Sequence, residues 1–207
     1  MTPLRFYIAR LMGNDDMLSS LSVPRDELLG TLRGKSVALV GNARALSGGT
    51  QGAEIDDHDR VVRINLAPMP SPESHGRRTD WLGLATRLPR SERARIDPAR
   101  ILWMSHKRKR LDHRSAHTDG FYLHPRADYD ALRDTLGAQP TTGAMLIELL
   151  LRSELARLDL YGFDFFASKS LSGSRSAEQV PHDFTGEADW VNRLRQRDPR
   201  LKLHPPG

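Results

Sequence analysis

Residues 36–65, SVALVGNARALSGGTQGAEIDDHDRVVRIN, decide the fold of this protein. The segment opens with a short apolar run, Ser36 to Val40, and closes with a second run, Arg60 to Asn65. Both runs are partly β-branched and end next to an asparagine, which predicts two buried strands. A loop of glycine and small residues, 43–52, follows the first run, and 53–59 has room for a turn of helix. Residues 36–65 are therefore predicted to form a strand, a loop of the phosphate-binding type, and a second strand.

Apolar runs farther along the chain predict a sheet in which strands alternate with helices. The additional strands are expected at 81–85, 101–104, 158–161 and 201–203. The helices are expected at 87–100, 127–136, 142–155 and 187–196. The run from Thr142 to Leu155 is apolar nearly all round, which predicts a buried helix capped by Thr141 or Thr142. Such alternation is typical of an α/β protein with a Rossmann-like, doubly wound, mostly parallel sheet.

The length of 207 residues allows one domain. Residues 1–34 are expected to form an N-terminal helical segment of one or two short helices, followed by a single domain over 35–207. No stretch approaches the ~18 consecutive apolar residues of a membrane-spanning helix. Residues 1–14 are amphipathic but lack the continuous apolar core of a signal peptide. These features predict a mature cytoplasmic protein.

Composition narrows the chemistry that the chain can perform. The absence of cysteine excludes disulfide scaffolds, thiol nucleophiles and cysteine-based metal or iron–sulfur sites. The 31 Lys and Arg against 26 Asp and Glu give a net charge of +5, which predicts attraction to nucleotides, nucleic acid or an acidic membrane. No metal is expected, because His113 and His117 have helical spacing but no evident third ligand.

Polar residues follow three of the predicted strands. Gly41 and Asn42 end one, Asn65 ends the next, and residues 162–164, Gly-Phe-Asp, end a third. Because ligands bind beyond the carboxyl ends of parallel strands, these residues are expected to share one pocket. The asparagine amides suit a nucleotide base, ribose or phosphate, although they could equally close turns.

Residues 140–143, Pro-Thr-Thr-Gly, precede the predicted buried helix. Their hydroxyl and backbone N–H groups lie at the positive end of the helix dipole, which predicts an anion site, although capping alone explains them equally well. The glycines after the first strand fit neither the dinucleotide fingerprint nor the Walker loop.

One histidine stands out by its position. His182 comes just before the helix expected at 187–196, and a helix N-terminus favours its neutral form. A neutral imidazole can accept a proton near pH 7, so His182 is a candidate general base. The alternative is a surface or capping histidine.

Three longer motifs, in the same order along the chain, resemble those of the sialyltransferase family, glycosyltransferase family 29, including its short bacterial members. The segments that carry the resemblance are 37–44 (VALVGNAR), 52–68 (GAEIDDHDRVVRINLAP), 76–79 (GRRT), 140–146 (PTTGAML), 158–163 (LDLYGF) and 182–187 (HDFTGE). The first three are similar to the large motif of the family, the next two to its small motif, and the last to its very small motif, His-x4-Glu.

The resemblance implies an inverting, metal-independent glycosyltransferase catalytic domain with a sialyltransferase-type variant of the GT-A fold. It would move sialic acid or a related ulosonic acid from a CMP-sugar co-substrate to a hydroxyl of a glycan or a lipooligosaccharide-type glycolipid, without a cofactor. By the same resemblance His182 is the general base and Glu187 supports its segment. The residues implied in donor binding are Gly41, Asn42, Ala43 and Asn65 for CMP, Thr141, Thr142 and Gly143 for its ribose or phosphate, and Gly162 and Phe163 beside the cytosine.

Two departures from the family pattern qualify this picture. The cysteines that the family would bridge align with Val37 and Leu155, which suits a reducing cytoplasm. The family's third motif, a His-Tyr pair, has no counterpart in 167–180. We hypothesise that Lys169 or Arg175 supplies the missing positive charge to the donor phosphate.

Other functions remain open at this stage. The basic run 107–110, with Arg114, fits a nucleic-acid or membrane-binding module, or simply a solvated face. The low aromatic content, 6%, disfavours nucleic acid as a partner. The run could instead hold the enzyme at the periphery of an anionic inner membrane or bind an anionic glycolipid acceptor. CMP-Kdo or CMP-Kdn could replace CMP-sialic acid, and the chain could be a non-catalytic CMP binder.

Overall fold

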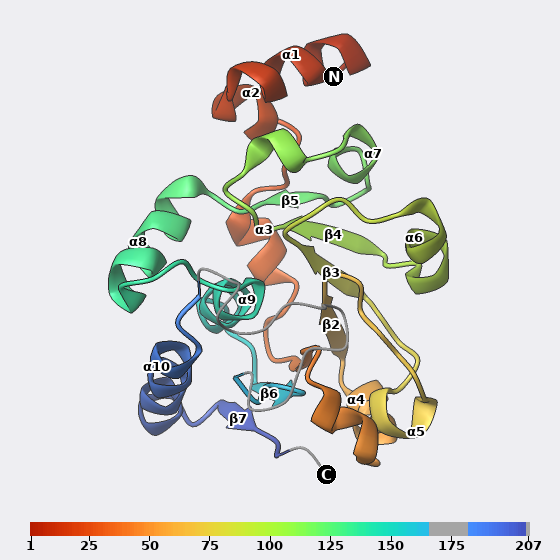
Figure 1. The fold of residues 1–207 in the computed structure, drawn as a ribbon, viewed down its shortest axis with the longest axis vertical. Coiled ribbons are helices and arrows are strands. Elements are labelled where there is room, and N and C mark those ends of the chain that lie inside the picture. The colour runs from red at the N-terminus through yellow and green to blue at the C-terminus, as the bar shows by residue number, and fades with distance from the viewer. Residues whose placement is uncertain (166–181, 206–207) are drawn as a thin grey trace.

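The computed structural model describes residues 1–165 and 182–205. These residues are built around one seven-stranded sheet (Figure 1). The strand order is β5-β4-β3-β2-β1-β6-β7, and every neighbouring pair in it is parallel. The strands are β1 (Ser36–Val40), β2 (Arg60–Ile64), β3 (Trp81–Leu84), β4 (Arg100–Trp103), β5 (Tyr122–Leu123), β6 (Arg157–Tyr161) and β7 (Leu201–Leu203). The predicted doubly wound, parallel α/β sheet is confirmed.

The order of the strands places a topological switch beside β1. From β1 the chain winds outward to β5 and then returns to the other side of β1 as β6. Val40 pairs with Arg63 of β2 on one side and with Tyr161 of β6 on the other. The loops that follow β1 and β6 therefore leave the sheet as neighbours. In open parallel sheets this is where ligands bind.

Helices cover both faces of the sheet. One face packs against α3 (Arg25–Gly30), α8 (Arg126–Leu136), α9 (Thr142–Leu151) and α10 (Phe184–Arg197). The other face packs against α1 (Pro3–Met12), α2 (Asp15–Ser19), α4 (Gly52–Asp57), α6 (Arg90–Ile96) and α7 (His113–Ala116). The other elements of the described residues are the short η1 (Arg44–Gly48), α5 (Pro72–His75) and η2 (Arg108–Arg110). Because both faces are covered, most strand residues are apolar, and the two charged side chains buried within strands, Arg63 and Asp159, have polar partners.

The side chains of the central strand β1 contribute to two hydrophobic clusters, one on each face of the sheet. Val37 and Leu39 of β1 point into the cluster formed with α9, whereas Ala38 and Val40 point into the cluster beneath α4. All four side chains are at most 2% exposed. Since successive side chains of a strand alternate between faces, a run with no polar break is what a doubly covered strand requires.

Several element boundaries differ from the sequence-based expectations. The N-terminal segment forms three short helices rather than one or two, and the leucines of α3 lie in the same core cluster as β1. The helix expected at 142–155 ends at Leu151, where i to i−3 bonds replace the helical pattern: the N–H of Ser153 donates to the carbonyl of Leu150 at 3.0 Å. The two-residue strand β5 was not predicted. Within the described part of the chain, no helix is both long enough and apolar enough to cross a bilayer.

Candidate active site

The loops after β1 and β6 approach each other so closely that one of them requires glycine. The N–H of Gly41 donates to the carbonyl of Tyr161 at 2.8 Å, and the N–H of Ala43 donates to that of Gly162 at 3.2 Å. A Cβ added at Gly41 would clash with the carbonyl oxygen of Gly162. Gly162 itself has a φ of 66°, a conformation that glycine adopts at no steric cost. The predicted convergence of these two strand ends is confirmed.

The two asparagines link successive strand ends. The Nδ2 of Asn42, which is 9% exposed, donates to the carbonyl of Ile64 at 3.4 Å. Asn65 has a φ of 51°, and its Oδ1 accepts from the N–H of Ala85 at 3.0 Å. Asparagine tolerates this left-handed conformation better than most residues. Within residues 1–165 and 182–205, the Nδ2 of Asn65 has no acceptor, so both of its protons remain for a ligand.

The N-terminus of α9 carries free donors next to the β6 loop. Thr141 is the N-cap, and its Oγ1 accepts from the N–H of Ala144 at 3.1 Å. The N–H groups of Thr142 and Gly143 have no acceptor in the described part of the chain. A Cβ added at Gly143 would lie 2.6 Å from Cε1 of Phe163, so the ring of Phe163 lies against this first turn. Helix N-termini with free N–H groups favour anions.

A buried carboxylate from α10 holds this helix end in place. Glu187 is 5% exposed, and it accepts from the N–H of Thr141 at 2.7 Å and from the Oγ1 of Thr141 at 2.8 Å. Burial raises the pKa of Glu187 to about 7, although the two bonds from Thr141 oppose the shift and nearby Asp183 adds to it. Glu187 therefore fixes Thr141, the N-cap residue of α9, through two hydrogen bonds.

His182, which precedes α10, also contacts the segment that leads into α9. Its Nδ1 is 2.7 Å from the carbonyl oxygen of Gln139, two residues before Thr141. Because a carbonyl oxygen only accepts, the proton must reside on Nδ1, and in the neutral ring Nε2 then carries the lone pair. The ring is half-buried, with its centroid 5.9 Å from that of Phe184. His182 and Glu187 are thereby both tied to residues 139–141.

Some predicted site residues fall outside the structural description. Lys169 and Arg175 lie in 166–181, outside the described residues, so their proposed contacts with the phosphate stay predictions. Among the described residues, no group of three His, Asp or Glu side chains could hold a metal ion.

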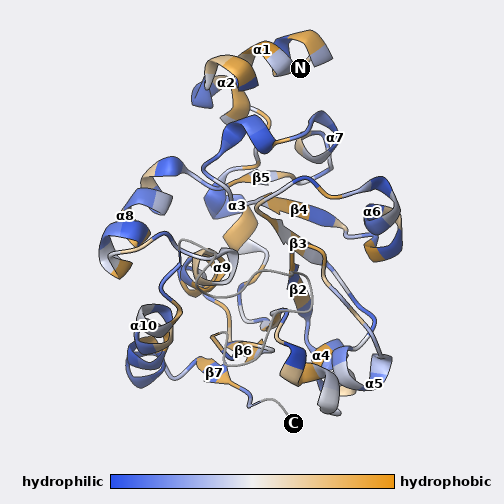
Figure 2. Cartoon of the chain, viewed as in Figure 1, coloured by the Kyte–Doolittle hydropathy of each residue, from blue (hydrophilic) through white to orange (hydrophobic). Residues whose placement is uncertain are grey.

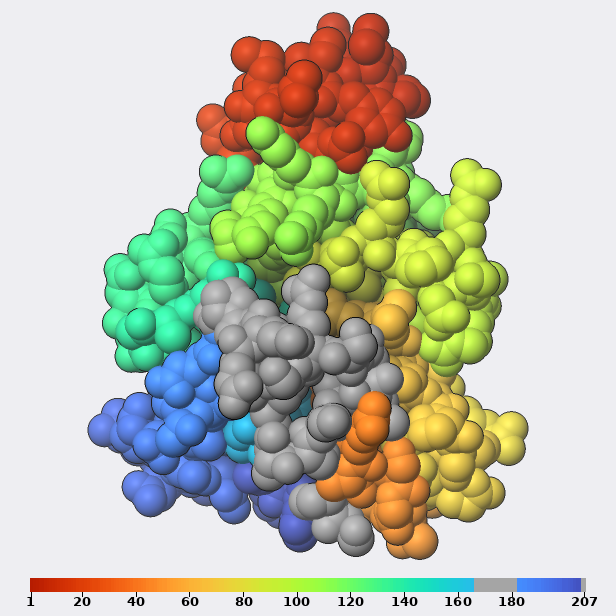
Figure 3. Space-filling view, viewed as in Figure 1, coloured from red at the N-terminus to blue at the C-terminus, as the bar shows by residue number. Residues whose placement is uncertain are grey.

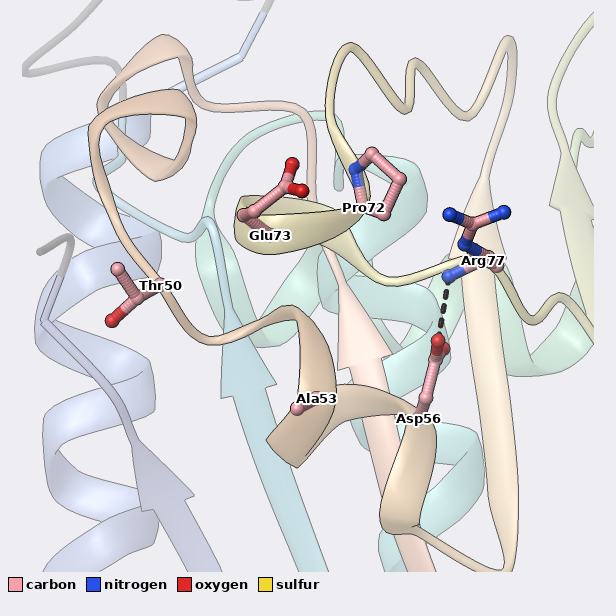
Figure 4. A pocket seen from close by; sticks show the side chains of 6 residues that line it. All are labelled: Thr50, Ala53, Asp56, Pro72, Glu73 and Arg77. Carbon is pink, nitrogen blue, oxygen red and sulfur yellow. Dashed lines mark hydrogen bonds between the residues drawn. The ribbon is translucent and has the colours of Figure 1, made fainter.

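A surface depression of about 410 Å³ lies away from these strand ends, between α4 and α5 (Figure 4). Both carboxylates that line it already have hydrogen-bond partners. The carboxylate of Asp56 accepts from the N–H of Arg77 at 2.7 Å and from that of Arg78 at 3.0 Å, and Glu73 accepts from the hydroxyl of Ser71. We therefore regard this part of the large motif as a clamp between α4 and α5. The remaining residues that line the depression are Thr50, Ala53 and Pro72.

Arg63 is a structural residue that the sequence analysis did not single out. It is 1% exposed, and it donates to the carbonyls of His75 at 2.6 Å and Arg78 at 2.8 Å. Burial lowers the pKa of Arg63 to about 10. The arginine holds the 75–78 loop against β2, two residues before Asn65. The sequence did contain a signal for this buried role, because Arg63 is flanked by apolar residues within a predicted strand.

A second buried cluster surrounds Asp159 on the sheet face opposite α9. Asp159, 1% exposed, is 3.0 Å from Nε2 of His58 and 2.7 Å from Nε2 of His204, and it pairs with Arg157. Burial opposes ionisation, but the bonds from both histidines and the charge of Arg157 hold the pKa of Asp159 at about 2. The Nδ1 of His58 lies 2.8 Å from the carbonyl oxygen of Glu54. Burial opposes the charged form of His58, but its hydrogen bonds to Asp159 and Glu54 outweigh burial and raise its pKa. This cluster ties β7 and α4 to β6.

Comparison with known proteins assigns the chain to a family. Residues 8–111, half of the chain, match the model of glycosyltransferase family 29 (sialyltransferase). The chain belongs to glycosyltransferase family 29. It is therefore a CMP-sugar-dependent glycosyltransferase of the sialyltransferase family. The matched segment includes Gly41, Asn42 and Asn65, but it ends before Thr141 and His182.

Solved structures show the same fold. A mammalian sialyltransferase is 21% identical, with coverage of 83% of this chain and 69% of that one and a TM-score of 0.60. A mammalian sialyltransferase in complex with Gal-beta-1-3GalNAc-ortho-nitrophenol is 18% identical over 97% of this chain and 84% of that one, with a TM-score of 0.65. CstII from Campylobacter jejuni, in complex with CMP-3FNeuAc, is 12% identical over 82% and 79%, with a TM-score of 0.52. No curated protein matches the chain. These likenesses confirm the expected sialyltransferase fold.

Apolar packing surrounds the two positions at which the resemblance implies family cysteines. Val37 and Leu155 are 0% and 2% exposed, and both belong to the main core cluster of this family 29 enzyme. Hydrophobic burial there is worth about 1.5–3 kcal/mol for each side chain, the same order as a disulfide. Burial in a common core can therefore take over the anchoring that the resemblance assigned to a bridge.

Proposed function

We propose that this family 29 enzyme transfers sialic acid or a related ulosonic acid, with inversion and without a metal, from its CMP donor to a hydroxyl of a glycan or a lipooligosaccharide-type glycolipid. The observation that carries the proposal is the bond from Nδ1 of His182 to the carbonyl of Gln139. It leaves the lone pair of Nε2 for the acceptor proton, and it holds the ring at Gln139, two residues before the N-cap of α9.

The donor is proposed to lie across the ends of β1, β2 and β6. Asn65 contributes the Nδ2 protons that have no acceptor among the described residues, and Asn42 lies buried next to it along the edge. Gly41, Ala43 and Gly162 allow close approach of the CMP moiety, and Phe163 borders the cytosine. The N–H groups of Thr142 and Gly143 contact the ribose or phosphate; the unshared donors of a helix N-terminus support this assignment.

The proposed step moves one proton and exchanges one bond. His182 takes the proton of the acceptor hydroxyl through Nε2 while that oxygen attacks the anomeric carbon of the sugar. The bond from this carbon to the phosphate oxygen of CMP breaks, and positive charge develops on the ring as in an oxocarbenium ion. The free N–H groups of α9 stabilise the departing phosphate, and Lys169 or Arg175 adds positive charge. Glu187 is a positioning residue.

The first test is calorimetric titration with CMP, CMP-sialic acid, CMP-Kdo and UDP in the presence of a chelator. We expect cytidine nucleotides to bind and UDP not to bind. Asn65→Asp keeps the Oδ1 that accepts from Ala85 but replaces both donor protons with a negative charge. CMP affinity should then fall by at least about tenfold, the effect of losing one hydrogen bond to a charged group. Failure of every cytidine nucleotide to bind would overturn the proposed donor site.

The second test separates catalysis from binding. His182→Ala should retain CMP binding and lose transfer by about 10²–10⁴-fold, the usual contribution of a general base. His117→Ala is the matched control, because Nδ1 of His117 also donates to a backbone carbonyl, at 2.8 Å, but His117 is an exposed residue at the C-cap of α7. Full activity of His182→Ala would contradict the assignment of the base. The CMP sugar that supports turnover in this assay identifies the transferred sugar as sialic acid, Kdn or Kdo.

Two further predictions belong to this proposal. We propose that the chain is a short, bacterial-type member of the family and that it works in a reducing cytoplasm. Val37 and Leu155 at the positions of the family cysteines support both.

A further inference from the structure

The large apolar side chains that are exposed in this protein gather at its N-terminus. Within residues 1–165 and 182–205, every strongly exposed large hydrophobic residue lies in the first 17. Leu4, Leu11 and Met12 are 71%, 73% and 78% exposed. The other members are Met1, Tyr7, Ile8 and Met17. Single exposed apolar side chains are ordinary, but a contiguous group marks an interaction surface.

Helix α1 has two apolar faces, and the wider one faces outward. Phe6 and Ala9, at most 1% exposed, pack into the core on one side. Leu4, Ile8 and Leu11 follow the i, i+4, i+7 spacing that places them together on the opposite side. Figure 2 shows the resulting hydrophobic colouring along α1, and Figure 3 shows the N-terminal residues at one end of the molecule. The sequence therefore gives an exposed apolar stripe to a helix that is already anchored by its other face.

Positive charge surrounds this stripe. On the helical projection of α1, Arg5 and Arg10 fall at the two borders between its faces. The guanidinium of Arg10 lies 4.9 Å from the ring centroid of Tyr7 and donates to the carbonyl of Leu111 at 3.0 Å. That contact joins α1 to the basic run at η2. Arginine stems that lie along an apolar stripe with their charges at its edge suit a polar–apolar boundary.

The basic run adds exposed cations beside α1. Lys107, Lys109 and Arg110 are exposed, and none of them forms an ion pair within the described part of the chain. Arg108 differs: it is 2% exposed, bonds to Asp15 at 2.7 Å, and donates to the carbonyl of Ser105 at 2.8 Å. The run is thus one structural arginine that fixes α2 to η2, together with three cations directed at solvent.

We propose that this surface, formed by Leu4, Ile8, Leu11 and Met12 of α1 with Lys107, Lys109 and Arg110, docks on an anionic lipid bilayer. An apolar stripe bordered by cations is complementary to acyl chains beneath acidic headgroups. A second copy of the chain is a poorer occupant, because a two-fold contact would bring the same unpaired cations face to face. Helix α1 lies in the plane of the interface. The proposal is independent of the transfer reaction.

The test is sedimentation of the full chain with vesicles of phosphatidylcholine alone, or of phosphatidylcholine mixed with phosphatidylglycerol. We expect binding to the anionic vesicles, weakened by salt, and little binding to the neutral ones. Leu4→Ser/Leu11→Ser should lower the partition coefficient by about tenfold or more for each inserted leucine. Lys107→Gln/Lys109→Gln/Arg110→Gln should lower it by about fivefold for each cation.

The matched control is Arg193→Gln/Arg195→Gln/Arg197→Gln, which removes three exposed cations from α10. It should bind vesicles as the wild type does. Equal loss in this variant would show attraction by net charge alone and overturn the proposal. Absence of wild-type binding, or unchanged binding of the leucine variant, would also overturn it. So would a dimer, detected by light scattering without lipid, that the leucine substitutions dissociate.

Discussion

Replacement of Glu187 by glutamine tests the connection between α10 and α9. Burial raises the pKa of this carboxyl from 4.5 to about 7. The folded protein thus holds the proton more tightly than the unfolded chain. The stability from this group is fully present below pH 4.5 and is lost as the pH rises through about 7. A shift of this size corresponds to about 3 kcal/mol, at about 1.4 kcal/mol for each tenfold change in proton affinity.

The assay is urea unfolding of the wild type and Glu187→Gln at several pH values. Glutamine has no proton to lose, so the stability of the wild type relative to the variant should fall by about 3 kcal/mol between about pH 4.5 and about pH 8. Glu154→Gln is the control, because the side chain of Glu154 is 72% exposed. A difference between wild type and Glu187→Gln that is independent of pH, or that changes in the opposite direction, would refute the reasoning.

The same variant has a functional consequence. The carboxamide cannot accept from both the N–H and the hydroxyl of Thr141, so the first turn of α9 loses one of its two supports. We expect weaker donor binding, measured as a higher KM for the CMP sugar, with a smaller effect on kcat. A loss confined to kcat would instead place Glu187 among the reacting groups.

Three further substitutions test other parts of the structure. Gly41→Ala should lower both the thermal unfolding midpoint and CMP affinity, because the added methyl clashes with the β6 loop; Gly30→Ala, where a Cβ meets nothing within 4 Å, should lower neither. Asp159→Asn should cost about 3 kcal/mol in urea unfolding near pH 7 by stranding its basic partners, and the wild type should lose this stability as the pH falls from 3.8 towards about 2. Arg108→Gln should cost about 3 kcal/mol on the same assay, whereas Lys109→Gln should change stability by less than about 0.5 kcal/mol. Equal effects at the last two positions would contradict their different burial.

The sheet could be predicted because its signals are local. Mostly apolar runs identified the strands, although Arg63 and Asp159 interrupt two of them, and the asparagines and glycines after the runs marked the ends that converge at the switch beside β1. Strand β5 was not predicted because its two residues are too few to show the hydrophobic pattern of a strand. The end of α9 was misplaced because Leu155 is apolar and buried although it lies beyond the helix.

The sequence by itself determined the fold class, the strand ends that converge at one edge of the sheet, and the residues that resemble a sialyltransferase. Only the tertiary structure decided what those residues contact. Glu187 meets Thr141 across 46 positions, and His182 meets Gln139 across 43, so their partners depend on how α10 packs against α9. The burial of Arg108 among exposed cations could not be predicted from the basic run either, because its contacts with Asp15 and His124 come from segments that fold against it. Local periodicity specifies secondary structure, but hydrogen-bond partners and desolvation depend on the packing of distant segments.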